Sequence, residues 1–299
     1  MTWDGVWPAI TTPFDADVAI DLGRLRRKVR RLREAGCAGV VALGTLGETP
    51  SLGPEEKEEV VRTVREEWPD PGGLCVGVSG YSTEAMARWA VRAKELGAGK
   101  LMVLPPYVYR GDEREVESHF DRIFSATELP CMLYNNPISY GTDVRPSSLR
   151  RLAGRHAHFV AVKESSGEIG RFTEIARDGP TRLARFVGID EQIVDGVRAG
   201  AVGWVAGLAN ALPEESIALL RWAREGPAAR ADELYRWFLP LLRMDSDPKL
   251  VQRIKLVEEE VGLGPAHLRA PRLPLVGPER EATLATIRER LARRPALTG

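Results

Sequence analysis

Short apolar runs alternate with amphipathic segments along most of this chain. Eight of these runs end at Gly, Pro or a polar residue, and a segment with apolar side chains at helical spacing follows each of them. This alternation is typical of repeated βα units that build a parallel sheet. Eight units close a barrel, so we predict strands over residues 5–10, 38–43, 74–78, 100–104, 130–133, 159–162, 184–187 and 203–206.

Helix start signals support the same pattern. Gly53-Pro54-Glu55-Glu56, Ser82-Thr83-Glu84 and Arg145-Pro146-Ser147 each precede an amphipathic segment. Beyond Pro213 the pattern changes to helices alone, with Leu and Trp at helical spacing. We therefore predict an α/β fold: a (β/α)8 TIM barrel over residues 1–212 and a helical extension packed on it over residues 213–299.

Charge and hydropathy limit the classes of partner. The 42 basic and 42 acidic residues cancel, so no global field recruits nucleic acid or an anionic membrane. No apolar stretch approaches the length needed to span a bilayer, and the first residues lack the pattern of a secretory signal. We expect a cytoplasmic protein that binds a small molecule, with no nucleic acid and no membrane partner.

Two compositional features qualify this expectation. A basic cluster over residues 24–33 is the best argument for a polyanion partner, but its apolar residues fall at helical spacing, and we interpret the cluster as a solvated helix face. The three cysteines, Cys37, Cys75 and Cys131, lie far apart in apolar stretches. They are expected to be reduced structural thiols.

Lys163 is the strongest candidate for a catalytic residue. It ends the apolar run 158–162 and precedes a polar turn, whereas the other six lysines fall on polar helix faces or in loops. A lysine amine is nucleophilic near neutral pH only when burial or a cationic neighbour disfavours its ammonium form. Lys163 is therefore a candidate Schiff-base lysine, and the alternative is an ion-paired lysine at a strand end.

The other candidates follow the other predicted strands, because the chemistry of such a barrel lies at the carboxyl ends of its strands. The turn 44–48 after the second strand offers backbone amides and the hydroxyl of Thr45, which together can hold a carboxylate. Tyr134 follows the fifth strand. Asp190 and Glu191 follow the seventh, and Gly203 and Gly207 leave room for a ligand at the eighth.

These motifs resemble the dihydrodipicolinate synthase and N-acetylneuraminate lyase family of Schiff-base pyruvate enzymes. The resemblance spans nearly the whole chain and is carried by Gly44-Thr45-Leu46-Gly47-Glu48, Tyr134-Asn135-Asn136-Pro137 and Lys163-Glu164-Ser165-Ser166-Gly167. The opening segment 5–14 is similar to the first strand of the family and the turn that follows it.

The resemblance implies a mechanism and a set of site residues. Lys163 would form the Schiff base, Tyr134 would move protons, Thr45 would relay them, and Tyr107 matches a family tyrosine that reaches into a neighbouring subunit's site. A homotetramer or homodimer follows from that last role. The iminium is an electron sink by itself, so no metal and no organic cofactor is expected, and the four histidines lack zinc-ligand spacing.

Three departures from the family pattern bear on the substrate. Ser139 stands where the synthases have an arginine that binds a substrate carboxylate, and Leu46 replaces the usual second hydroxyl. The segment Gly188-Ile189-Asp190-Glu191 resembles the lyase branch, in which the acidic pair binds substrate hydroxyls, although both residues also suit a helix start. We thus expect substrate contacts from Thr45, Leu46 and Ser139, and from Gly188, Asp190, Glu191 and Gly203.

The sequence favours a Schiff-base-forming lyase, that is an aldolase, dehydratase or deaminase, acting on pyruvate or another 2-oxo acid or its cyclic imine. The enzymatic alternative is a 4-hydroxy-tetrahydrodipicolinate synthase that condenses pyruvate with aspartate semialdehyde. A non-catalytic barrel that binds a keto acid as a sensor is an alternative of another class, motivated by Leu46. A nucleotide phosphate loop at residues 44–47 is disfavoured, because the Lys-Ser/Thr ending is missing.

Overall fold

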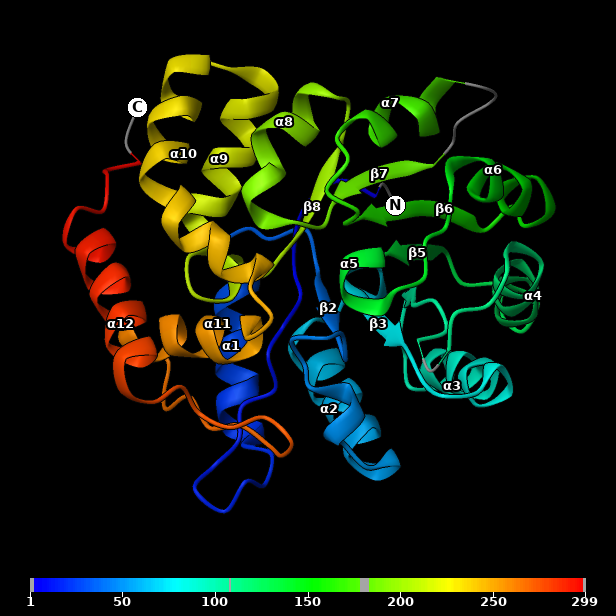
Figure 1. Ribbon diagram of the computed structural model, residues 1–299. Helices are drawn as coiled ribbons and strands as arrows, with labels where there is room; N and C mark the ends of the chain where they lie inside the picture. Colours follow the sequence, from blue (N-terminus) through cyan, green and yellow to red (C-terminus); the bar gives the residue numbers. More distant parts are fainter. Residues whose placement is uncertain (1–2, 108, 178–182, 298–299) are drawn as a thin grey trace.

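Eight parallel strands form a nearly closed barrel in a computed structural model that describes residues 3–107, 109–177 and 183–297 (Figure 1). The sheet order is β1-β8-β7-β6-β5-β4-β3-β2, and a parallel bridge between Ala9 and Val41 joins the first two strands. The strands are β1 (Gly5–Pro8), β2 (Val40–Ala42), β3 (Leu74–Val78), β4 (Lys100–Val103), β5 (Cys131–Asn135), β6 (Phe159–Glu164), β7 (Ala184–Val187) and β8 (Gly203–Ala206). The predicted (β/α)8 barrel is confirmed, and each strand overlaps its predicted range.

Helices cover the outside of the barrel. They are α1 (Leu22–Glu34), α2 (Pro54–Glu67), α3 (Thr83–Glu95), α4 (Glu113–Phe124), α5 (Pro137–Tyr140), α6 (Pro146–Arg155), α7 (Gly170–Arg177), α8 (Ile193–Arg198), α9 (Pro213–Glu225), α10 (Ala228–Leu242), α11 (Leu250–Glu260) and α12 (Gly277–Ala292). The start signals act as expected: α2 begins at Pro54, α6 begins at Pro146, and the Ser82 side chain accepts a hydrogen bond from the Ala85 N–H.

The C-terminal helices α10, α11 and α12 lie together at one side of the barrel, next to α1 and α9 (Figure 1). The helix α9 follows β8 after the 3-10 helix η4 (Leu208–Asn210), and it contacts β1 and α8. The division of the chain into two parts at residue 212 stays a prediction. One short element between α10 and α11, the 3-10 helix η5 (Arg243–Ser246), packs against the 3-10 helix η3 (Asp190–Gln192) that follows β7.

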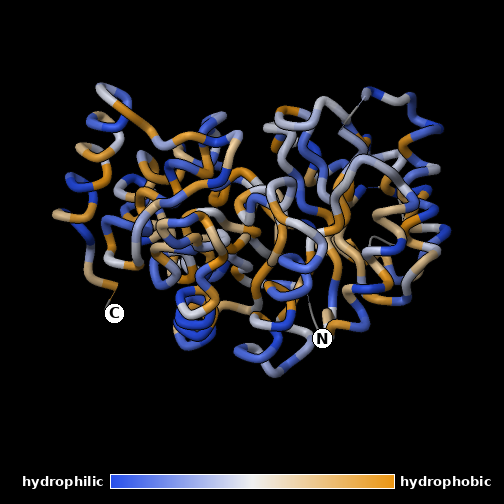
Figure 2. The backbone as a smooth tube through the Cα atoms, turned by 90° about the horizontal axis from the view of Figure 1, so that it is seen from below, coloured by the Kyte–Doolittle hydropathy of each residue, from blue (hydrophilic) through white to orange (hydrophobic). Residues whose placement is uncertain are grey.

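Apolar segments gather in the interior, while hydrophilic turns of the helices lie outside (Figure 2). The strands read as nearly continuous apolar runs because both faces of a parallel barrel sheet are buried. All three cysteines are buried and free, as expected. Within the described residues, none of the helices is both long and apolar enough to traverse a bilayer.

The interpretation of the basic cluster on α1 as a solvated face is wrong for two of its residues. Arg24 and Lys28 are buried, and they make intramolecular contacts: the Arg24 guanidinium donates to the carbonyls of Phe14 and Pro265, and Lys28 is paired with Glu258 at 2.7 Å. Apolar spacing marks the core face of a helix, but it does not show that a long basic side chain beside that face finds a buried partner.

Candidate active site

Lys163 is buried at the carboxyl end of β6, with 7% of its surface exposed. The parallel register pairs it with Tyr134 of β5, and its Nζ lies 4.1 Å from the centroid of the Tyr134 ring. Burial lowers the pKa of Lys163 below its ordinary value, and the negative charge of Asp245 opposes this shift in part. Among the described residues Lys163 has no salt-bridge partner, so its environment favours the neutral, nucleophilic amine.

Lys163 is not the only buried lysine, and this corrects the assignment of the other six to polar faces and loops. Lys28 and Lys255 are buried and ion-paired, with Glu258 and Glu48. Lys100 is buried at the amino-terminal end of β4, where its Nζ donates to the Gly72 carbonyl and lies 4.7 Å from the centroid of Trp7. Each of these three amines is bound by a carboxylate or carbonyl oxygen, which distinguishes them from Lys163.

A cavity of ≈ 420 Å³ opens over Lys163 at the carboxyl ends of the strands. This is the size range of small-molecule sites. Seven predicted site residues border it: Lys163, Tyr134, Thr45, Leu46, Gly188, Ser139 and Gly207. A larger depression of ≈ 520 Å³ between α6 and α7 is more open, contains no lysine, and holds Arg171 already paired with Asp143 and Glu168.

The turn after β2 presents unused backbone donors to the cavity. The N–H groups of Gly47 and Glu48 donate within the turn, whereas the described part of the chain offers no acceptor to those of Thr45 and Leu46. Leu43 and Glu48, at the two ends of the turn, have positive φ values of 59° and 54°. Non-glycine residues keep such backbone angles only where their surroundings hold them, which is common at ligand sites.

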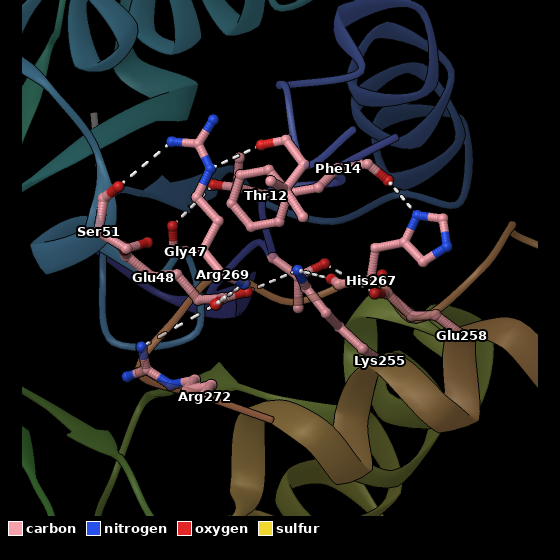
Figure 3. Close-up of polar contacts among 12 residues, drawn as sticks. Thr12, Phe14, Gly47, Glu48, Ser51, Lys255, Glu258, His267, Arg269 and Arg272 are labelled. Carbon is pink, nitrogen blue, oxygen red and sulfur yellow. Dashed lines mark hydrogen bonds and ion pairs between the residues drawn. The ribbon is translucent and has the colours of Figure 1, made fainter. Parts of the chain in front are cut away.

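Glu48 fixes this turn to the C-terminal part of the chain (Figure 3). Its fully buried carboxylate accepts hydrogen bonds from Lys255 Nζ at 2.6 Å and from the Arg269 N–H at 3.2 Å, and it is 4.0 Å from the guanidinium of Arg272. Arg272 also borders the cavity. The sequence did not point to Arg272, because it lies in an irregular segment between α11 and α12, far along the chain from any barrel strand.

The hydroxyl of Thr45 is hydrogen-bonded to the hydroxyl of Tyr140, a residue that the sequence reasoning did not name. The Tyr134 and Tyr140 rings meet edge to face at 5.7 Å, and the Tyr134 hydroxyl accepts from the Asn136 side chain at 2.8 Å. Burial raises the pKa of Tyr134 to about 12 and raises the pKa of Tyr140 as well. Both phenols therefore stay protonated near neutral pH and are available as proton donors.

Tyr107 does not border the cavity of its own chain. Its ring lies 5.7 Å from Tyr140 and 5.8 Å from Tyr81, which is 77% exposed. Tyr107 therefore continues the row of aromatic rings from the site toward the surface. Its contribution to a neighbouring subunit's site stays a prediction.

Asp190, Glu191 and Gly203 lie outside the cavity lining. Asp190 is fully buried in η3 and accepts hydrogen bonds from Trp204 Nε1 at 2.8 Å, the Gly207 N–H at 3.0 Å and the Leu208 N–H at 2.8 Å. Glu191 is paired with Arg243 at 3.0 Å. Gly203 pairs within the sheet and packs against the Phe186 ring. In this arrangement Asp190 anchors the loop that follows β8.

Asp245 is a further carboxylic acid at the site that the sequence reasoning missed. It lies in η5, borders the cavity together with Lys163, and belongs to the helical segment outside the barrel strands. Its neighbours Asp247 and Arg253 are paired at 3.2 Å. No local signal marks Asp245 in the sequence, because only the packing of η5 on η3 brings it to Lys163.

The site as described combines a desolvated amine, two protonated phenols, free backbone amides and a buried carboxyl group. In the described ranges 3–107, 109–177 and 183–297, no cluster of three or more His, Cys, Asp or Glu side chains is arranged to hold a metal ion. An amine beside a proton donor can attack a carbonyl carbon, and the resulting adduct can then lose the carbonyl oxygen as water.

Comparison with known proteins agrees with this geometry. The sequence profile of the Dihydrodipicolinate synthetase family matches residues 2–290. A 4-hydroxy-tetrahydrodipicolinate synthase of Streptomyces coelicolor is 35% identical over 92% of this chain and 89% of its own length. The enzyme of the same name from Methanothrix thermoacetophila is 32% identical over 99% of this chain and 98% of its own length.

Solved structures give the same result. The 4-hydroxy-tetrahydrodipicolinate synthase of Methylacidiphilum fumariolicum superposes with a TM-score of 0.92 and 29% identity, over 98% of both chains. A dihydrodipicolinate synthase of Thermotoga maritima reaches a TM-score of 0.91 with 26% identity, over 97% of this chain and 98% of its own. The chain belongs to the dihydrodipicolinate synthetase family and is an enzyme of the lyase class.

Proposed function

We propose that this protein is a Schiff-base-forming lyase that acts on pyruvate or another 2-oxo acid, or on its cyclic imine, through Lys163. One observation carries the proposal: the buried Lys163 amine has no salt-bridge partner among the described residues, lies 4.1 Å from the centroid of the Tyr134 ring, and borders a cavity. Neither an exposed lysine nor one locked to a carboxylate has a reactive free base near neutral pH.

The proposed reaction begins with attack of the neutral Lys163 amine on C2 of the 2-oxo acid. Tyr134 donates a proton to the carbinolamine oxygen, water leaves, and an iminium forms. The iminium withdraws electrons from C3, so a bond at C3 or C4 breaks or forms without further help from an electron sink. The N–H groups of Thr45 and Leu46 support binding of the C1 carboxylate, since both residues border the cavity and neither N–H has an acceptor among the described residues.

Ser139 and Arg272 support a narrower substrate class. Ser139 borders the cavity at the position where the synthases have an arginine, so a bidentate carboxylate clamp is missing from α5. Arg272 supplies a guanidinium on another wall of the same cavity. We infer that the substrate's distal end is a small polar group such as a hydroxyl, and that Arg272 binds it.

The second candidate is 4-hydroxy-tetrahydrodipicolinate synthase activity. Relatives of that name at 35% and 32% identity favour it. Ser139 argues against it, because a serine cannot replace the two parallel hydrogen bonds of an arginine. Measured condensation of pyruvate with aspartate semialdehyde at a rate typical of enzymes would decide for the synthase.

An oligomer is part of the proposal. Tyr107 lies in a row of rings that ends at the exposed Tyr81, which suits a contact between subunits. We propose a homodimer or homotetramer in which this row completes a neighbour's site. Sedimentation of the intact chain measures the assembly, and a monomer with full activity would contradict it.

Borohydride trapping tests the proposed function. The enzyme is incubated with pyruvate and sodium borohydride, and the reduced adduct is mapped by mass spectrometry. We expect the adduct on Lys163, its loss in Lys163→Ala, and its retention in Lys249→Ala, which removes an exposed lysine paired with Glu279. Absence of an adduct on Lys163 with pyruvate and with every 2-oxo acid of the screen below refutes the function. A screen of 2-oxo-3-deoxy sugar acids, hydroxylated pyrroline carboxylates and sialic acid then identifies the substrate.

A further inference from the structure

Two carboxyl groups, Asp190 and Asp245, meet at Gly207, just after β8. A methyl group at Gly207 would lie 2.3 Å from Asp245 Oδ1 and 3.3 Å from Asp190 Oδ2, so both side chains pack against the bare Cα of this glycine. Like charges this close are not both ionised without a large cost. The pair therefore tends to hold one proton, and the surrounding hydrogen bonds decide which carboxyl carries it.

The hydrogen bonds assign the charge to Asp190. Its two oxygens accept from Trp204 Nε1 and from the N–H groups of Gly207 and Leu208, all of which are donors only. These donors stabilise the carboxylate form, because none of them can accept a hydrogen bond from the O–H of a carboxylic acid. Asp245 accepts from one backbone N–H, that of Asp190, and among the described residues no side chain donates to it.

Asp245 therefore has hydrogen-bonding capacity that its neighbours do not use. It also borders the cavity, whereas Asp190 does not. Burial raises the pKa of Asp245 well above its ordinary value, and the nearby Asp190 raises it further. Burial also lowers the pKa of Lys163. Asp245 borders the same cavity as Lys163, so it is the nearby carboxyl group that can accept the proton that the amine must lose before it reacts.

We propose that Asp245 is the catalytic base and acid that removes and returns the proton at C3 of the 2-oxo acid bound to Lys163. This inference rests on the proposed Schiff-base function. Tyr134 and Tyr140 are less suited to this step. Burial raises the pKa of both phenols, so Tyr134 regains a proton from Asp245 once it has protonated the carbinolamine oxygen, and the Tyr140 hydroxyl is already bonded to Thr45.

The step is a proton transfer between carbon and oxygen. Asp245 enters this step as a carboxylate, because it has returned a proton to Tyr134 after Tyr134 protonated the carbinolamine oxygen. The carboxylate takes one proton from C3 of the iminium, and an O–H bond forms as the C–H bond breaks. The C–H electron pair becomes the C2=C3 double bond, and the electron pair of the C=N double bond moves onto the Lys163 nitrogen, which gives a neutral enamine. Return of the same proton to C3 reverses the step. No oxidant, reductant or metal ion takes part in this balance.

Deuterium exchange into pyruvate tests the proposal without knowledge of the natural substrate. The enzyme is incubated with pyruvate in D2O, loss of the methyl signal is followed by NMR, and borohydride-trapped adduct on Lys163 is quantified in parallel. For Asp245→Asn we expect adduct within about threefold of wild type and exchange slower by roughly 10²- to 10⁴-fold, the usual contribution of a general base. Asp245→Glu should recover part of the exchange.

Asp232→Asn is the matched control, because Asp232 is an exposed carboxylate on α10 paired with Arg198 at 3.2 Å. It should exchange at the wild-type rate. The inference is overturned if Asp245→Asn exchanges deuterium at the wild-type rate. It is also overturned if Asp245→Asn has a native circular dichroism spectrum but loses adduct and exchange in parallel, since that result assigns Asp245 to lysine activation alone. If the wild-type enzyme forms no adduct at all, the proposed function fails instead.

Discussion

The Nζ atom of Lys163 lies 4.1 Å from the centroid of the Tyr134 ring, and the two residues are direct partners in the register of β5 and β6. Side chains at paired positions of neighbouring parallel strands point to the same face of the sheet. The register therefore fixes the amine beside the phenol before any substrate arrives. The ring face attracts an ammonium group, but burial opposes it more strongly, because the pKa of Lys163 is lowered.

Tyr134→Phe separates the ring from the hydroxyl. The ring should still cover Lys163 and keep the fold, whereas the proton donor for the carbinolamine oxygen is lost. We expect adduct formation with pyruvate to slow by about 10²- to 10⁴-fold. The time course of borohydride-trapped product measures this. Unchanged kinetics in Tyr134→Phe, together with slow kinetics in Tyr140→Phe, would assign the donor to the tyrosine that is bonded to Thr45.

The pH dependence of adduct formation follows from the lowered pKa of Lys163. Only the neutral amine reacts, so the rate should rise with pH and level off below pH 10.5, the ordinary pKa of lysine. The charges of Asp245 and Asp190 and the nearby Tyr140 raise the Lys163 pKa in opposition to burial. Asp245 is a carboxylate while Lys163 holds the proton, so Asp245→Asn removes a negative charge that favours the ammonium form and should move the plateau to lower pH. Initial trapping rates between about pH 6 and pH 11 measure both profiles, and a wild-type rate still rising at pH 10.5 contradicts the desolvated amine.

Gly188→Ala should disturb the position of Lys163. A methyl group at Gly188 would lie 2.7 Å from Lys163 Cε and 2.0 Å from Ser165 Oγ, so the lysine side chain must move. We expect adduct formation to slow by about 10²-fold, the cost of a misplacement near 1 Å. Gly154→Ala in α6 is the control, since its added methyl group would meet no described atom within 4 Å outside the neighbouring helix backbone. Equal trapping rates in the two variants would show that Lys163 tolerates the displacement.

The strands and the lysine could be predicted because their signals are local. The apolar run that becomes β6, followed at once by a polar turn, identified Lys163, and runs of the same kind gave all eight strands. The partners of the lysine could not be predicted in the same way. Thr45 and Tyr140 are 95 positions apart, and their hydrogen bond depends on how α5 folds back over the cavity.

The C-terminal part of the chain supplies two site residues that sequence reasoning did not identify. Asp245 and Arg272 reach the cavity only because η5 packs on η3 and the segment after α11 crosses the turn at Glu48. Nothing in the spacing of a helical extension shows which of its polar residues face the barrel. The same limit explains Lys255, whose position suggested a polar helix face although its partner Glu48 lies 207 positions away.

The buried pair of Glu48 and Lys255 is expected to stabilise the fold through the attachment of the β2 turn to α11 (Figure 3). Both side chains are almost fully buried, at 0% and 3% exposure. Lys255→Met leaves the Glu48 carboxylate without its main partner, and removal of one member of a buried pair costs about 3–5 kcal/mol. Denaturant-induced unfolding should show this loss in the free energy of unfolding.

The double variant Glu48→Gln/Lys255→Met tests whether the loss of stability in Lys255→Met comes from the unpaired Glu48 charge or from the changed packing around it. Removal of both charges should restore most of the loss, because the desolvated carboxylate is gone and an amide still accepts the Arg269 N–H. Arg122→Met, which breaks an exposed pair with Glu84, should barely change the unfolding midpoint. If the double variant is as unstable as Lys255→Met, the ion pair itself, and not relief of a buried charge, holds the turn on α11.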